Sequence, residues 1–201
     1  MTSANTINMG TVIEPIPHQA HSKGVIGMTC LIVAESAIFL IFVVAYLFYI
    51  GKDLSGPTPR QILELPIVNS ICLLSSSVTI MFALRALRNG DTRRFGLWWL
   101  ATILLGAYFL FGTGIEWYRL IYHKHFTIQT NLFGTTFYSL VGLHATHVVI
   151  GLIALLTVMA FAVAGWVKQE HAERTHVLGM YWHFVDTVWI VVFTVVYIIG
   201  R

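Results

Sequence analysis

Five hydrophobic stretches, each long enough to cross a lipid bilayer, constrain the fold of this chain more than any other feature. They lie at about residues 25–50, 66–87, 95–120, 132–167 and 177–200. About 20 apolar residues in a helix cross a hydrocarbon core of roughly 30 Å, and an isolated segment in lipid pairs its own backbone groups only as a helix. The composition agrees, because 57% of the residues are hydrophobic and 10% are charged, against about 25% charged in soluble domains. The sequence therefore predicts an all-α membrane protein, a bundle of five transmembrane helices.

The segments outside these stretches predict one domain and its orientation. Residues 1–22 are polar and lack the apolar core of a signal peptide, so we expect an N-terminal arm followed by one transmembrane domain at 23–201. One side of the predicted bundle carries seven of the twelve Lys and Arg residues (Lys23, Arg85, Arg88, Arg93, Arg94, Lys168 and Arg174). The positive-inside rule then predicts that the N-terminus lies inside and the C-terminus outside. The chain has no block of basic residues, and we expect no nucleic-acid partner.

Six acidic or histidine side chains fall inside the predicted spans and form our candidate intramembrane polar core: Glu35, Glu116, His144, His147, His183 and Asp186. Charge in hydrocarbon is costly, so such residues usually face protein or trapped water. Glu35 lies roughly 15 Å along the first span, near the middle of the bilayer. Its plausible partners are His144 or His147. Whether such a contact is a structural hydrogen bond or a proton-linked site stays open at this point.

Two further spacings bear on chemistry. His144 and His147 are three residues apart and share a helix face, which suits either a metal or haem ligand pair or two neutral histidines bonded across helices. A zinc or copper site needs a third and usually a fourth ligand, so we favour the structural interpretation and predict no metal site and no catalytic residue. His183 and Asp186 are also three apart, as are Glu116 and Arg119, and pairing within a helix would reduce the cost of burial.

A basic rim at the predicted inner side is a candidate lipid site. Lys168, Arg174 and His176 lie in or beside the link between the last two spans and suit anionic headgroups, although an ordinary solvated loop that obeys the positive-inside rule is the favoured interpretation. Trp182 joins these lipid-contact candidates, because aromatic residues near span ends commonly lie at the membrane interface. Trp98 and Trp99 fit the same interfacial interpretation.

Several motifs occur together and in order: Ala34-Glu35-Ser36, Leu65-Pro66-Ile67-Val68-Asn69-Ser70, Glu116-Trp117-Tyr118, Gly142-Leu143-His144-Ala145-Thr146-His147-Val148 and Tyr181-Trp182-His183-Phe184-Val185-Asp186. With these motifs the chain resembles subunit III of the haem–copper terminal oxidases, in the five-helix form common in bacteria. The longest members of that family have seven helices. Glu35 looks like the family's carboxyl that reacts with carbodiimides.

The resemblance implies a multi-pass protein of the bacterial cytoplasmic membrane with no cofactor of its own. Its haems and copper would belong to partner subunits, chiefly the catalytic subunit I, with subunit II and a small subunit IV as further candidates, and phospholipid would be bound. Such a subunit supports assembly, lipid binding and proton uptake in a proton-pumping oxygen reductase. A subunit III-like component of a quinol oxidase or nitric oxide reductase system, and a stand-alone metal-binding membrane protein, remain alternatives.

Overall fold

The computed structural model describes residues 23–50, 66–130 and 132–200, so the predicted arm at 1–22 lies outside the described residues. Its long helices are α1 (Lys23–Tyr49), α3 (Ile67–Arg88), α4 (Thr92–Tyr122), α5 (Leu132–Val163) and α6 (Ala172–Phe193). A short 3₁₀ helix, Gln169–His171, precedes α6, and a π-helical turn, Thr194–Ile199, continues it. Five helical segments are long and apolar enough to cross a membrane, and the described residues form no strand. The predicted fold class is confirmed.

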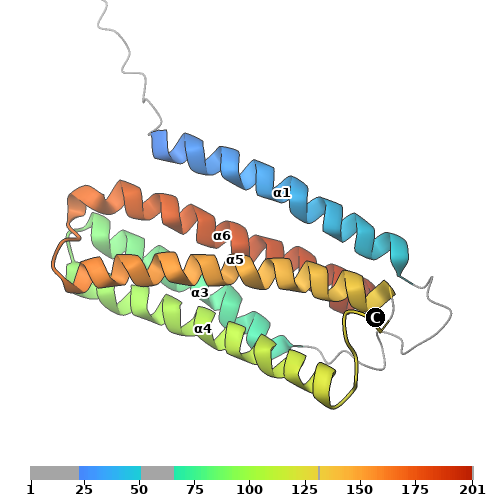
Figure 1. Ribbon diagram of the computed structural model, residues 1–201. Helices are drawn as coiled ribbons and strands as arrows, with labels where there is room; N and C mark the ends of the chain where they lie inside the picture. Colours follow the sequence, from blue (N-terminus) through green and yellow to red (C-terminus); the bar gives the residue numbers. More distant parts are fainter. Residues whose placement is uncertain (1–22, 51–65, 131, 201) are drawn as a thin grey trace, which may run out of the picture.

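Four helices form a ring and the fifth lies against its side (Figure 1). In the ring α3 packs on α4, α4 on α5, α5 on α6 and α6 on α3, while α1 packs on α5 and α6. The start of α1 and the end of α6 lie at opposite ends of the bundle, as an odd number of spans requires. Which end faces the cytoplasm stays a prediction from the charges.

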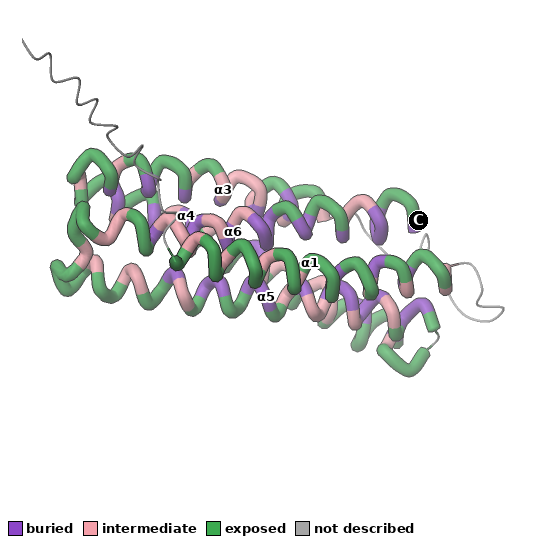
Figure 2. Tube along the Cα trace, turned by 90° about the horizontal axis from the view of Figure 1, so that it is seen from above, coloured by how far each residue is buried: buried purple, intermediate pink, exposed green. Residues whose placement is uncertain are grey.

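Burial is uneven among the helices. Helix α1 buries only Phe39, Val43 and Tyr46 among its 27 residues, and Figure 2 shows it mostly exposed along its length. Apolar burial against protein gains little in lipid, where helices associate through close packing and hydrogen bonds. In the four-helix ring this close packing occurs around Trp182, which is fully buried. A Cβ at Gly106 of α4 or at Gly151 of α5 would lie 2.8 Å from the Trp182 ring, so both glycines are needed to admit it.

The interfacial interpretation of the tryptophans therefore needs correction. Trp99 and Trp182 are both completely buried, and each indole N–H donates inside the bundle, to Leu155 O at 2.9 Å and to Ser76 Oγ at 2.8 Å. An indole N–H satisfied by a neighbouring helix removes the usual reason for tryptophan to seek the interface. Trp98, at 40% exposure, is compatible with the interface.

Two glycine caps close helices at the same end of the bundle. Gly90 and Gly165 have φ of +78° and +75°, the left-handed conformation that glycine adopts at low cost. After α5, Trp166 N–H donates to Phe161 O and Gly165 N–H donates to Ala162 O, which is the Schellman pattern. This cap ends α5 at Val163, four residues before the predicted end of that span.

Candidate functional site

The Glu35–His147 pair joins α1 to the ring. Glu35 Oε2 lies 3.1 Å from His147 Nε2, and the other ring nitrogen, Nδ1, lies 2.8 Å from Leu143 O, one turn back in α5. Tyr181 of α6 donates to the backbone carbonyl of His147 at 3.2 Å. The predicted contact of Glu35 with this histidine pair is therefore confirmed at His147, and three helices meet there.

The partners of His147 fix how many protons the pair holds. A carbonyl only accepts, so Nδ1 must carry a hydrogen and donate to Leu143 O. A hydrogen bond from Nε2 to Glu35 then needs one more proton, either on Glu35 or on Nε2. Both arrangements give a pair with zero net charge, a form that a low-dielectric site tolerates far better than an isolated ion. The pair can thus pass one proton between an oxygen and a nitrogen without changing its net charge.

His144 has a different environment, although it lies one helical turn from His147. It is 1% exposed, its ring stacks on Trp189 with 5.0 Å between centroids, and Phe109 meets it edge-on. Neither of its ring nitrogens has a hydrogen-bond partner among the described residues. Contact with Glu35 was one of two predicted options for His144, and the geometry gives that contact to His147 instead.

His183 and Asp186 meet through a serine of α3. Ser77 Oγ donates to Asp186 Oδ2, and His183 Nδ1 lies 3.1 Å from the same hydroxyl. Since a serine hydroxyl has one hydrogen, which goes to Asp186, it accepts from Nδ1–H of His183. The predicted pairing within one helix is thus replaced by a bridge between α3 and α6. Asp186 is 3% exposed, and its Oδ1 has no partner among the described residues.

Two tryptophans of α6 make further hydrogen bonds from α6 to α3. Trp182 donates to Ser76 at 2.8 Å, and Trp189 donates to Ser70 at 3.1 Å. Both serines also bond to carbonyls of their own segment, Ser76 to Leu73 O and Ser70 to Pro66 O. Neither serine was assigned a hydrogen bond from the sequence. Their pairing with two tryptophans spaced seven residues apart is the pattern from which these hydrogen bonds between α3 and α6 could have been predicted.

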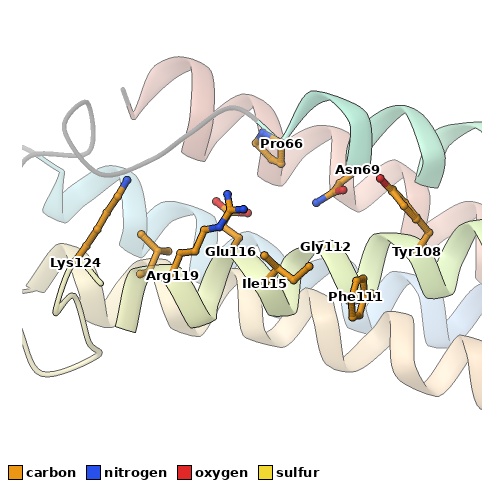
Figure 3. A pocket seen from close by; sticks show the side chains of 10 residues that line it. Pro66, Asn69, Tyr108, Phe111, Gly112, Ile115, Glu116, Arg119 and Lys124 are labelled. Atoms are coloured by element: carbon orange, nitrogen blue, oxygen red, sulfur yellow. The ribbon is translucent and has the colours of Figure 1, made fainter. Parts of the chain in front are cut away.

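Glu116 lies in a separate site near the other end of the bundle. It accepts a hydrogen bond from Tyr197 of the π-helical turn at 3.1 Å. Glu116 also lines a cavity of about 300 Å³ between the start of α3 and the second half of α4, together with Arg119 and Lys124. Figure 3 shows these three side chains toward one end of the cavity and Tyr108 and Phe111 toward the other. The cavity is amphipathic, with charge at one end and aromatic rings at the other.

The candidate lipid residues lie in different environments. Lys168 and Arg174 are exposed and His176 is half-buried, so the first two have surface available for an anionic headgroup. Trp182 has none, because it is 0% exposed within the ring. Lipid contact at Trp182 does not fit that position, whereas lipid binding at the three rim residues stays a prediction.

The six predicted core residues thus occupy four places rather than one. Glu35 joins His147, His183 joins Asp186 through Ser77, Glu116 joins Tyr197, and His144 lies alone among aromatic rings. No group of three His, Cys, Asp or Glu side chains within the described ranges is placed to hold a metal ion. What these contacts can do chemically is join helices and hold protons at defined atoms.

Comparison with known proteins agrees with this arrangement. The family described as Cytochrome c oxidase subunit III matches residues 11–201. Proteins named cytochrome c oxidase subunit 3 are similar over most of the chain. The one from a Bacillus species is 35% identical, covering 83% of this chain and 81% of its own length, and the one from a Synechocystis species is 39% identical, covering 86% and 74%. A third, from Alkalihalophilus pseudofirmus, is 33% identical, covering 83% and 82%.

These relatives are bacterial, and the described chain has five helices able to cross a membrane, so it is a multi-pass protein of a bacterial membrane. The match to the family extends over far more than half of its length, and its relatives carry the subunit 3 name. The chain belongs to the cytochrome c oxidase subunit III family.

Proposed function

We propose that the chain is a subunit III without redox centres, which stabilises the catalytic subunit of a proton-pumping oxygen reductase and supports its proton uptake. Its role as subunit III of a terminal oxidase follows from its family. The observation that carries the finer proposal is that His147 uses both ring nitrogens for protein partners, Leu143 O and Glu35. Such a histidine has no nitrogen left for iron or copper, but it does hold a proton at a helix–helix contact.

The same proposal assigns the haems and copper to partner subunits, with subunit I as the main contact and subunit II and a small subunit IV as further neighbours. Phospholipid is expected at the basic rim. Lys168 and Arg174 support this assignment, because both are exposed at the end of the bundle that the positive-inside rule assigns to the cytoplasm.

Purification of the intact complex through a tag on this chain tests the assignment. We expect a haem-bearing catalytic subunit to co-purify, oxygen consumption driven by cytochrome c, and haem absorbance that follows the amount of the partner. If the tagged chain emerges alone, or with its own iron or copper, the proposal is refuted. Oxidation of quinol instead of cytochrome c, or reduction of nitric oxide, would assign the chain to one of the two alternative complexes.

Two substitutions of Glu35 separate a structural contact from a proton-linked one. In Glu35→Gln the amide N–H can still donate to Nε2 of neutral His147, so the helix contact remains but the exchangeable proton is lost. In Glu35→Leu both are lost. A proton-linked role predicts lower proton pumping or a shorter turnover lifetime in both variants, measured in reconstituted vesicles. A structural role predicts that only Glu35→Leu changes them, and Val33→Ala, at a nearby position that is 65% exposed, serves as the control.

A further inference from the structure

We propose that a transmembrane helix of another subunit packs on the outer surface of α3 and α6 around His183 and donates a hydrogen bond to the His183 ring. This surface, defined by Met81, His183, Thr187 and Ile190, is called the α3–α6 face below. The proposal rests on the proposed function, since it names which side of the chain meets a partner within the oxidase complex.

The first step concerns the hydrogen bonds of His183. Its Nδ1–H donates to Ser77, whose own hydrogen goes to Asp186. Burial in a low-dielectric interior favours the uncharged imidazole, whose remaining nitrogen, Nε2, then carries a lone pair that accepts but cannot donate. No hydrogen bond from the described residues reaches this atom, and the side chain is only half-buried, so Nε2 is open to a donor from outside the chain. The buried Oδ1 of Asp186 has no partner among the described residues either, but only His183 Nε2 lies where an outside group can reach it.

The second step concerns depth. Ser77 lies at the middle of the 22-residue α3, and His183 lies at the middle of the segment Gln169–Ile199. Both are therefore about 15 Å or more from either end of the bundle, inside the hydrocarbon core, where neither lipid headgroups nor bulk water reach. An open imidazole acceptor at that depth costs free energy unless protein covers it.

The third step concerns the surrounding surface. Met81 lies one turn from Ser77 on α3, and Ile190 lies two turns from His183 on α6. They are 41% and 51% exposed. Beside them an apolar groove of about 250 Å³ runs between α1 and α6, lined by Leu40, Thr187 and Val191 among others. An apolar helix would lay side chains into this groove and would need one Ser, Thr, Tyr, Trp or Asn opposite His183.

The outer side of α4 provides a contrast at the same depth. Thr79 of α3 bonds to Thr102 of α4 at 2.7 Å, which places Leu104 level with Ser77. Leu97, Leu100 and Leu104 are 63%, 43% and 61% exposed and present only apolar side chains. Hydrocarbon covers such a surface without cost, so α4 needs no protein partner there.

Photo-cross-linking in the purified complex tests the assignment. Benzoylphenylalanine is introduced at Met81, at Ile190 and, as the matched control, at Leu104. We expect the first two to cross-link to a membrane subunit that co-purifies with this chain, and Leu104 to cross-link only to lipid. Lipid adducts alone from all three positions, or protein capture at Leu104 equal to that at Met81, would overturn the proposal.

Substitution of the polar centre gives a second, independent measurement. His183→Leu should weaken retention of the chain in the complex by about threefold during detergent titration, the effect of one interhelical hydrogen bond of average strength. Leu104→Ala, at a 61% exposed position on α4, should leave retention unchanged. Unchanged retention in both variants would refute the bond to His183. A preparation that contains no haem-bearing partner refutes the proposed function, whereas a complete complex with lipid-only cross-links refutes the α3–α6 face alone.

Discussion

Replacing Gly106 by Ala tests whether close packing around Trp182 holds the four-helix ring together. The new Cβ would lie 2.8 Å from Trp182 Cη2, well inside the ordinary contact distance of 3.4–4 Å. The indole has little room to retreat, because a Cβ at Gly151 on the neighbouring helix would be equally close and because Nε1 is bonded to Ser76 at 2.8 Å. The methyl group therefore has to displace α4 or break that bond.

The expected change in the free energy of unfolding of Gly106→Ala follows from two opposing effects. Overpacking a dense core costs about 1–3 kcal/mol, while Gly→Ala in a helix interior contributes about 1 kcal/mol in the stabilising direction. Gly114 lies on the same helix, and a Cβ there would meet nothing within 4 Å. Gly114→Ala thus reports the helix propensity alone. The difference in the free energy of unfolding between the two variants should be the packing cost, about 1–3 kcal/mol.

The measurement is unfolding of the detergent-purified chain by SDS in mixed micelles, followed by far-ultraviolet circular dichroism. In a Trp182→Leu background the benzene ring that causes the main clash is gone, and the two glycine variants should then differ much less in stability, because only Leu152 Cδ2, at 3.1 Å, remains close to the new Cβ. Equal shifts of Gly106→Ala and Gly114→Ala in the wild-type background would refute the packing of α4 against Trp182.

Three further outcomes are expected. Gly165→Ala should reduce the free energy of unfolding by about 1–2 kcal/mol, because φ is +75° at this position; Gly27→Ala, with open space around its Cβ, should not, and equal effects would contradict the cap. Ser76→Ala leaves the buried Trp182 Nε1 without an acceptor and should cost about 1–3 kcal/mol, whereas Ser75→Ala, whose hydroxyl bonds to Cys72 O of its own helix, should be near neutral in the same assay. A tag at the C-terminus should resist a protease that is added on the cytoplasmic side of membrane vesicles; digestion of the tag would reverse the orientation.

The five helices and the contact of Glu35 with α5 were predictable because each follows from one large energy. A bilayer penalises unpaired backbone groups and isolated charges so strongly that hydrophobic length and the position of an acid nearly determine the outcome. Helix ends were harder to predict. The apolar run continues through Trp166 and Val167, but α5 stops at Val163 because Gly165 makes a left-handed cap more favourable than another turn.

Which histidine of α5 would meet Glu35 was not predictable from spacing. Residues three apart lie on the same broad face but differ by about 60° around the axis. That angle turns His147 toward α1 and His144 toward Trp189 and Phe109 in the ring. Likewise, the sequence places Trp182 near the start of an apolar stretch, where an interfacial position is the ordinary expectation. Its burial depends on Gly106 and Gly151 from two other helices, and only the packed structure brings these together.

Polar contacts decide how α1 sits on the ring, since it buries only three side chains. Glu35 meets His147, and about three turns further along Tyr46 donates to Val196 O in the π-helical turn at 3.4 Å. A slide of α1 by one turn, about 5.4 Å, would break both bonds and leave His147 Nε2 facing apolar side chains. We infer that the two bonds fix the register of α1, the best-attested use of buried polar pairs. The Glu35–His147 bond then serves both the register of α1 and the exchange of a proton. Loss of activity in Glu35→Leu therefore cannot by itself be assigned to proton transfer. Glu35→Gln keeps the register and removes the exchangeable proton, and only a defect in that variant identifies Glu35 as proton-linked.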